Sequence, residues 1–271
     1  MHASVPSIKT SNPGRPESPL NARLLTPSVN LFGLPVATLT LPEAVAHLAA
    51  ALRQPAPTVV CTLNADHITR ARQDPAFAAA YATANLIVAD GQSIRLAARL
   101  LGKPLPGRVT GIDLTWALLA HCAAHGHRVF LLGGTDATLS LCTAKLRKHF
   151  PTLPLAGTLH GYFTDPLAVR SAIAASGADL LIAGLGSPRQ ELFLAEHLPA
   201  SGCRVGIGIG GAMDVWAGNV ARAPLWMQQA GLEWLWRLLQ EPRRLLWRYL
   251  ASNSAFLLLL ARELRRGARR P

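Results

Sequence analysis

The sequence predicts an α/β protein, with a Rossmann-like, mainly parallel sheet, helices on both faces and a helical, membrane-binding appendage at the C-terminus. The first reason is that short β-branched or apolar runs alternate with longer Ala- and Leu-rich stretches between residues 31 and 220, which is typical of strand–helix–strand units. The second is that half of the 271 residues are apolar, enough for one substantial core. The third is a change of pattern after residue 220, where tryptophan and arginine accumulate.

Three segments of the chain are expected to differ in structure. Residues 1–30 contain five prolines and scattered polar residues, and they lack the apolar stretch of a signal peptide, so disorder is expected there. Residues 31–220 form the predicted α/β domain. Residues 221–271 form the predicted basic, amphipathic helical appendage.

The first half of the α/β domain contains two predicted strands and four predicted helices. Both strand segments are short β-branched or apolar runs, and the helical segments are longer and rich in Ala and Leu. In chain order these elements are a helix over 42–53, a strand over 58–63, a helix over 68–83, a strand over 86–89, and helices over 93–101 and 113–125.

The second half of the domain repeats this alternation and leads into the appendage. Its expected elements are a strand over 128–132, helices over 136–149 and 166–175, a strand over 180–183, a helix over 189–197 and a strand over 205–209. Two short amphipathic helices should follow. The first carries Leu232, Leu235, Trp236 and Leu239. The second begins near Pro242, where the missing proline N–H removes no helical hydrogen bond.

Polar residues or glycines follow each predicted strand. The carboxyl ends of parallel strands lie at one edge of a sheet, where ligands bind. Backbone N–H groups and helix N-termini at such an edge can hold a diphosphate. The candidate binding residues at these strand ends are Thr62, Asn64, Asp90, Gly133, Gly134, Gly186, Gln190, Gly210 and Asp214.

Asp90 is the candidate general base. It follows an apolar strand, and partial burial at the sheet edge would raise its pKa toward a useful value. The alternative is that Asp90 and Gly91 only form a turn. Thr62 and Asn64 lie two residues apart, so their side chains share one face of the strand. Asn64 can bind a sugar, cap the following helix, or do both.

Arg108 and Gln190 are two further candidate substrate-binding residues. Arg108 lies in a glycine-flanked loop, where a guanidinium can bind a diphosphate or remain a solvated surface group. Gln190 opens a helix that suits an anion or a sugar hydroxyl. The glycines of residues 206–211 match G-x-G-x-x-G, which supports a nicotinamide-dependent oxidoreductase as the alternative function. They lie within the strand and not after it, which argues against that alternative.

The positive charge is concentrated in the appendage. The net charge is +12, of which residues 221–271 supply +7 from ten Arg and three Glu. Such a patch attracts anionic lipid or nucleic acid, so a nucleic-acid-binding module is a third class. Four of the six tryptophans lie in the same segment. Tryptophan is typical of a water–lipid boundary, so we expect the patch to bind a membrane surface and not nucleic acid. The charge-free stretch over 249–261 is too short to span a bilayer.

Other classes of site have weak signals. The four cysteines form no C-x-x-C pair, which favours buried thiols and a cytoplasmic location. No D-x-D motif is present for a sugar-nucleotide-bound metal, so no cofactor and no metal are expected.

Eight strings resemble, in order and spacing, the WecG/TagA/CpsF glycosyltransferases (glycosyltransferase family 26). They are residues 62–64 (TLN), 89–91 (ADG), 108–111 (RVTG), 184–191 (GLGSPRQE), 208–214 (GIGGAMD), 222–224 (RAP), 231–234 (GLEW) and 241–244 (EPRR). The resemblance runs from about residue 31 to 249. Eight ordered motifs are far more specific than any one of them.

The resemblance implies an inverting transfer of a sugar from a UDP-sugar to a polyprenyl-diphosphate-linked sugar at the cytoplasmic face of the membrane. The product would be a β-linked disaccharide lipid for cell-surface polysaccharide or exopolysaccharide. N-acetylmannosamine, its uronic acid and glucose all occur as donor sugars in the resembling family, so the donor stays open. The oligomeric state stays open too, with a homo-oligomer as one option.

The resemblance also assigns roles to single residues. Asp90 is the implied base, and Thr62 and Asn64 line the pocket. Arg108 and Gln190 help to bind substrate, and Asp214 lies near the nucleotide. The appendage is expected to fold over the pocket and bring its arginines, Arg237 and Arg244, to the diphosphate. The family pattern has an arginine where Trp247 stands, one position before Arg248, so Arg248 is the less secure assignment.

Overall fold

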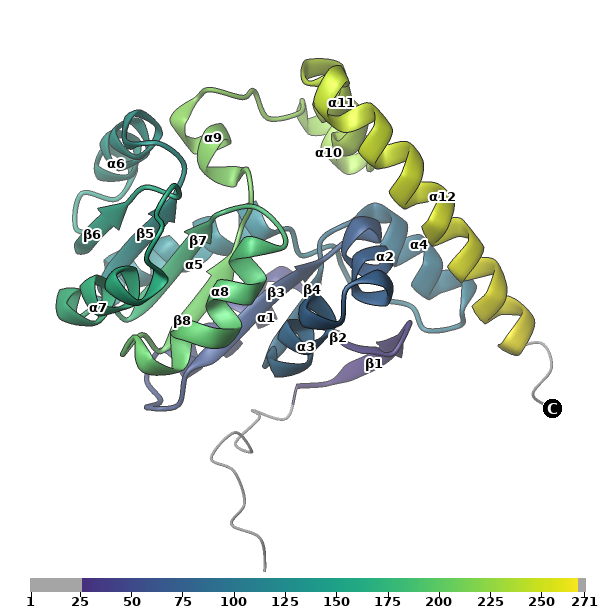
Figure 1. Ribbon diagram of the computed structural model, residues 1–271, viewed down its shortest axis with the longest axis horizontal. Helices are drawn as coiled ribbons and strands as arrows, with labels where there is room; N and C mark the ends of the chain where they lie inside the picture. Colours follow the sequence, from purple (N-terminus) through teal and green to yellow (C-terminus); the bar gives the residue numbers. More distant parts are fainter. Residues whose placement is uncertain (1–25, 268–271) are drawn as a thin grey trace, which may run out of the picture.

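The computed structural model describes residues 26–267, and the centre of this part of the chain is a six-stranded sheet (Figure 1). Its strands are all parallel and lie in the order β4-β3-β8-β7-β5-β6. The prediction of an α/β fold with a mainly parallel sheet is confirmed. The strands are β3 (Thr58–Leu63), β4 (Leu86–Ala89), β5 (Val129–Gly133), β6 (Leu155–Leu159), β7 (Leu180–Gly184) and β8 (Val205–Gly208).

Helices cover both faces of the sheet, because its central strands are apolar on both sides. Along β3, Val59, Cys61 and Leu63 belong to one core and Val60 belongs to the other. The first core is covered by α2 (Ala65–Gln73), α3 (Pro75–Thr83), α4 (Gln92–Leu100), α7 (Pro166–Ser176) and α8 (Arg189–His197), and the second by α1 (Leu41–Ala51), α5 (Gly111–His125) and α6 (Asp136–His149).

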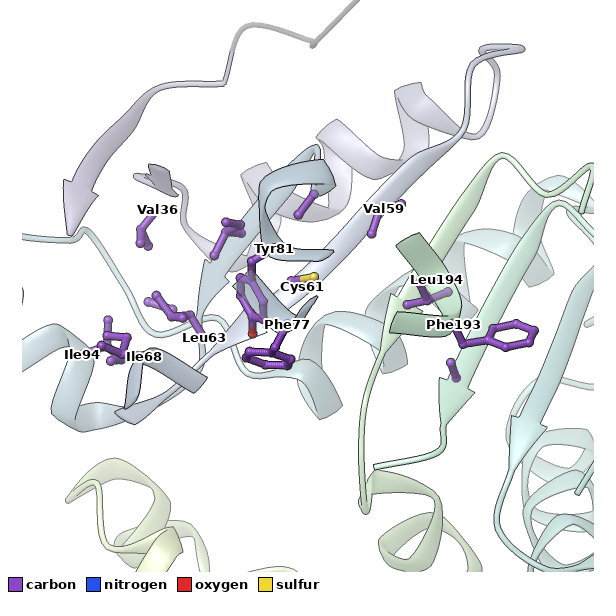
Figure 2. Packing of buried hydrophobic residues seen from close by; sticks show 14 of the residues in the cluster. Val36, Val59, Cys61, Leu63, Ile68, Phe77, Tyr81, Ile94, Phe193 and Leu194 are labelled. Atoms are coloured by element: carbon purple, nitrogen blue, oxygen red, sulfur yellow. The ribbon is translucent and has the colours of Figure 1, made fainter. Parts of the chain in front are cut away.

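The first core supports the carboxyl end of β3. Figure 2 shows Cys61 of β3 close to the rings of Phe77 and Tyr81 of α3. The centroids of these two rings are 4.9 Å apart. The buried Tyr81 hydroxyl donates a hydrogen bond to the carbonyl of Thr62 at 2.6 Å, which satisfies both polar groups. All four cysteines are unpaired and buried, as the sequence predicts.

The expectation of one helix over residues 68–83 is wrong, because two helices, α2 and α3, occupy this segment. Pro75 lacks a backbone N–H and begins α3, so α2 cannot continue through it. The Asp74 side chain accepts hydrogen bonds from the backbone N–H groups of Ala76 and Phe77 at 3.0 and 3.1 Å. The aspartate therefore caps the second helix.

Further elements have no counterpart in the expected set. They are the antiparallel hairpin of β1 (Ser28–Leu31) and β2 (Leu34–Ala37), the edge strand β6, and the short helices α9 (Ala212–Ala217) and α10 (Leu225–Gln229). The disorder expected over residues 1–30 is wrong for residues 28–30, which lie in β1. Residues 1–25 lie outside the described residues.

The appendage continues as α11 (Glu233–Gln240) and α12 (Pro242–Gly267), close to the expected helix positions. The expectation of two short helices is wrong for α12, which has 26 residues. One face of α12 buries Leu245, Phe256 and Leu260, and the Phe256 and Phe32 ring centroids are 5.4 Å apart. Figure 1 shows α12 lying along α2. Within residues 26–267, no helix combines the length and apolarity that crossing a bilayer requires.

Candidate active site

A cavity of about 190 Å³ lies where the carboxyl ends of β3, β4 and β8 meet the appendage. Asn64 follows β3, Asp90 follows β4, and Ile209 follows β8; all three line the cavity. Its other charged lining residues are Arg108 from the loop before α5, Arg222 from the loop before α10, and Glu233 and Arg237 from α11. The structure therefore brings together four of the residues singled out in the sequence, namely Asn64, Asp90, Arg108 and Arg237. We call the covering segment, α10 to α12, the roof.

Main-chain hydrogen bonds set the position of Asp90. Its backbone N–H donates to the carbonyl of Leu63 at 3.0 Å, which ties the end of β4 to the end of β3. The N–H of Val109 donates to the carbonyl of Ala89, also at 3.0 Å. The second bond lays the loop that carries Arg108 directly beside Asp90. Asp90 and Arg108 are thus neighbours because of backbone pairing.

Burial raises the pKa of the Asp90 carboxyl above its usual value. Loss of water penalises the ionised form, and the charge of Glu233 acts in the same direction. Arg108, the backbone N–H of Gly111 and His67 act in the opposite direction. A carboxylate with a raised pKa that still reaches a cavity can accept a proton from a bound hydroxyl.

Asn64 caps a helix and also lines the cavity. Its Oδ1 accepts a hydrogen bond from the backbone N–H of His67 at 3.1 Å, which is a helix N-cap. The side chain of Thr62 is buried beneath the cavity. Its methyl group lies against Gly111, where an added Cβ would come within 3.0 Å. We call the residues at the strand ends, together with the loop before α5, the floor of the cavity. Thr62 packs beneath this floor and does not line the cavity itself.

Arg108 belongs to a network of ion pairs that joins the floor to the roof. Its Nη2 lies 2.6 Å from Oε2 of Glu233 in α11. Glu233 also lies 3.6 Å from Arg222, whose Nη2 is 2.7 Å from Asp113. In the sequence, Glu233 stands out only as part of the string at residues 231–234. The spacing of that string does not indicate which arginine the glutamate reaches.

The roof is also seated on the floor by close packing. At Gly231 an added Cβ would come within 2.5 Å of the Gln92 side chain. Nη2 of Arg237 donates to the carbonyl of Gly211 at 3.4 Å. Gln92, Trp234 and other roof and floor residues line the cavity without having been singled out as site residues. Only the tertiary packing brings them there.

A strip of glycines continues from the cavity along the sheet edge. An added Cβ at Gly133 would overlap the carbonyl of Gly184, and one at Gly184 would come within 3.2 Å of the carbonyl of Gly210. Gly161 donates to the carbonyl of Gly134 at 2.9 Å. The backbones after β5, β7 and β8 therefore approach one another closely, as only glycine permits.

Four residues singled out in the sequence beyond β7 and β8, namely Gly186, Gln190, Gly210 and Asp214, lie outside the cavity lining. Gly186 has a φ of +76° and open space around it. Gln190 is buried: its Oε1 accepts from Gly210 N–H and its Nε2 donates to Glu191, both at 2.8 Å. Asp214 is half-buried on α9, with Asn219 Nδ2 3.4 Å from its Oδ1. Gln190 thus positions the backbone at Gly210.

The two remaining arginines lie on α12. Arg248 lines a separate hollow between α2 and α12, together with Asp66 and Arg70. Its guanidinium carbon is 5.5 Å from the ring centroid of Tyr249. Arg244 lies in the first turns of α12, and its side chain is outside the described part of the chain. The structure therefore places Arg237, and not Arg248, at the cavity.

The chemistry of the site follows from its charges. Its lining combines a carboxylate of raised pKa with arginines that can bind an anion. Among residues 26–267, no group of three or more His, Cys, Asp or Glu side chains is arranged to hold a metal ion.

Comparison with known proteins identifies a matching family model and two similar bacterial enzymes. The model described as the glycosyl transferase WecG/TagA/CpsF family matches residues 29–270. A Bacillus spizizenii protein is 33% identical over 210 residues, covering 78% of this chain and 81% of the relative. A Bacillus subtilis protein is 31% identical over 205 residues, covering 76% and 79%. Each relative is named N-acetylglucosaminyldiphosphoundecaprenol N-acetyl-beta-D-mannosaminyltransferase.

Proposed function

The chain belongs to the WecG/TagA/CpsF family of glycosyltransferases, and from that premise we propose that it transfers a sugar from a UDP-sugar to a polyprenyl-diphosphate-linked N-acetylglucosamine. The acceptor follows from the printed names of the relatives. The observation that carries the proposal is the cavity in which Asp90, with its raised pKa, lies beside Arg108 and beneath Arg237.

Asp90 acts as the general base in a single displacement. Its carboxylate takes the proton from the acceptor hydroxyl, whose oxygen attacks the anomeric carbon on the side opposite UDP. The bond to the UDP oxygen breaks, and the electron pair leaves with the diphosphate. One displacement inverts the configuration and produces a β-linkage. Arg108 and Arg237 stabilise charge near the diphosphates, an electrostatic role that typically contributes about 3–4 kcal/mol per well-placed donor.

The donor nucleotide occupies the glycine strip beside the cavity. The closely packed backbones after β5 and β7 can present N–H groups to a diphosphate without interference from side chains, whereas the Gly210 N–H after β8 already donates to Gln190. Gly133, Gly134, Gly186 and Gly210 would line this side, and Asp214 would accept a hydrogen bond from the uracil or ribose. The acceptor approaches from the roof, where Arg237 lies.

The appendage docks on the cytoplasmic face of the membrane as a peripheral element. Four of the five exposed leucines of α12 lie four, seven and seven residues apart, so they fall within roughly 40° of one another on a helix of 3.6 residues per turn, and Leu258 lies off this stripe. Exposed Trp226, Trp234 and Trp247 add amphipathic rings that suit a water–lipid boundary. The leucines of this apolar stripe are Leu246, Leu250, Leu257 and Leu264.

Thermal unfolding with nucleotides separates the proposed function from the oxidoreductase alternative. UDP at one hundred times its Kd is expected to stabilise the protein by about 2.7 kcal/mol, whereas NAD is expected to have no effect, because only a ligand of the folded state stabilises it. Uridine is the control for the uracil and ribose without phosphate, and AMP is the control for a phosphate on a different nucleobase. Stabilisation by NAD and not by UDP would support the oxidoreductase and refute the proposal.

The rate of transfer is expected to fall in acid, with a midpoint above pH 3.8, the ordinary pKa of aspartate. The base must be ionised, and burial raises the pKa of Asp90, so protonation removes the base at a higher pH than in water. Initial rates with labelled UDP-sugar across pH 4–8 measure this, with circular dichroism at each pH to exclude unfolding. A rate that stays constant down to pH 4 in folded protein would contradict the role of Asp90.

A further inference from the structure

Both terminal nitrogens of Arg108 face the roof. Nη2 lies 2.6 Å from Oε2 of Glu233, and Nη1 donates to the carbonyl of Gln228 at 3.4 Å. The Arg108 side chain is only 14% exposed and that of Glu233 only 23% exposed. A charge pair with so little access to water is screened less than a surface pair.

Asp90 is the other carboxylate beside Arg108. Backbone hydrogen bonds make the loop of Arg108 a neighbour of Asp90, and the two charges interact. Within residues 26–267, however, the ion pair of Arg108 within 4.0 Å is with Glu233 and not with Asp90. Glu233, and not Asp90, is therefore the close acidic partner of Arg108.

We propose that Glu233 is a positioning residue, which holds the Arg108 guanidinium against the roof and so keeps it from pairing with Asp90. The proposal rests on the function proposed above, in which Asp90 is the base. An Asp90 carboxylate paired with Arg108 would be a weaker base, because its charge would already be neutralised. Glu233 belongs to α11, so Asp90 is a strong base only while α11 covers the cavity. Placement of the roof over the cavity therefore also keeps the Asp90 carboxylate free of Arg108.

The charges around Asp90 agree with this arrangement. Glu233 acts to raise the pKa of Asp90, whereas Arg108 and His67 act to lower it. Arg237 from α11 also lines the cavity. Arg222 and Asp113 form the outer part of the network, 2.7 Å apart. Removal of the Glu233 charge leaves Arg108 without its close acidic partner, and Asp90 already interacts with the Arg108 charge.

A substrate-free titration tests the proposal in the full-length protein. Carbon-13 NMR of labelled aspartate carboxyls, with the Asp90 signal assigned by its loss in Asp90→Asn, reports the pKa of Asp90 directly. Glu233→Gln is expected to lower this pKa, and Glu233→Asp, which keeps the charge, is expected to restore most of it. Glu263→Gln is the control, because Glu263 pairs with Arg266 near the other end of α12. An unchanged pKa in Glu233→Gln would overturn the proposal.

A double variant separates positioning of Arg108 from a direct charge effect. If Glu233 acts through Arg108, Glu233→Gln lowers the pKa of Asp90 less when Arg108 is already glutamine. An equal change in both backgrounds would overturn the positioning role. In transfer assays, Glu233→Gln is expected to lose kcat several-fold and to move the acid midpoint to lower pH. The NMR titration uses no substrate, so it tests Glu233 even if no sugar transfer is found.

Discussion

Replacing Asp90 with asparagine is expected to slow sugar transfer by roughly 10²–10⁴-fold and to leave UDP binding intact. The amide keeps the shape of the side chain but cannot take the proton from the acceptor hydroxyl. In the proposed arrangement UDP contacts the glycine strip and the arginines, which the substitution does not alter. Transfer of labelled sugar measures the first effect, and isothermal titration with UDP measures the second.

The same variant is expected to unfold at a higher temperature than wild type at neutral pH. Burial raises the pKa of Asp90 in the folded state, so the folded protein binds more protons than the unfolded chain between pH 3.8 and that raised pKa. Stability therefore falls as pH rises through this window, and the cost remains above it. A neutral asparagine removes the cost, and each kcal/mol recovered corresponds to roughly 2–4 °C. The gain should vanish below pH 3.8.

Asp66→Asn is the matched control for these measurements. Asp66 lies two residues beyond Asn64, at the start of α2, and its side chain forms a 4.0 Å pair with Arg70 outside the cavity. Transfer by this variant is expected to match wild type. Wild-type turnover by Asp90→Asn would instead show that another group is the base.

Replacing Leu250 and Leu257 with glutamate is expected to weaken vesicle binding on the order of 100-fold or more. Both side chains belong to the exposed stripe of α12, at 51% and 62% exposure. Each buried leucine stabilises an apolar contact by about 1.5–3 kcal/mol, and each glutamate adds charge repulsion. Co-sedimentation with phosphatidylglycerol–phosphatidylcholine vesicles measures binding.

Leu141→Glu with Leu167→Glu is the control pair for the stripe. These leucines are 49% and 53% exposed on α6 and α7, away from α12. Vesicle binding by the control is expected to stay near that of wild type, and UDP binding is expected to survive in both pairs. Equal loss in both pairs, or none in the stripe pair, would refute docking through α12.

The alternation of strands and helices could be predicted because the central strands are continuous apolar runs. The edge strand β6 lacks that signal: its residues include Gly157 and Thr158, and none of them is fully buried. The hairpin of β1 and β2 was not predicted, because its first strand lies in the proline-rich segment for which disorder was expected. The break between α2 and α3 at Pro75 was present in the sequence, and the helical composition on either side obscured it.

The floor of the cavity could be predicted more fully than its roof. Asn64 and Asp90 follow neighbouring parallel strands, so topology brings them together. Arg108 joins them because the N–H of the next residue, Val109, donates to the carbonyl of Ala89 at the end of β4; in the sequence only the family resemblance suggested this. Gln190 faces inward to Gly210, and Glu233 reaches across the cavity to Arg108. Side-chain directions of this kind depend on packing that spacing does not encode.

The most direct test of the central claim is a lipid-product assay. Purified protein is incubated with a panel of labelled UDP-sugars and N-acetylglucosamine linked to undecaprenyl diphosphate, and the lipid fraction is analysed for a disaccharide. Wild type is expected to form labelled β-linked disaccharide lipid from one of these donors, and Asp90→Asn is expected to form almost none. Failure to form disaccharide lipid from any UDP-sugar, by protein that binds UDP and vesicles, would contradict this claim.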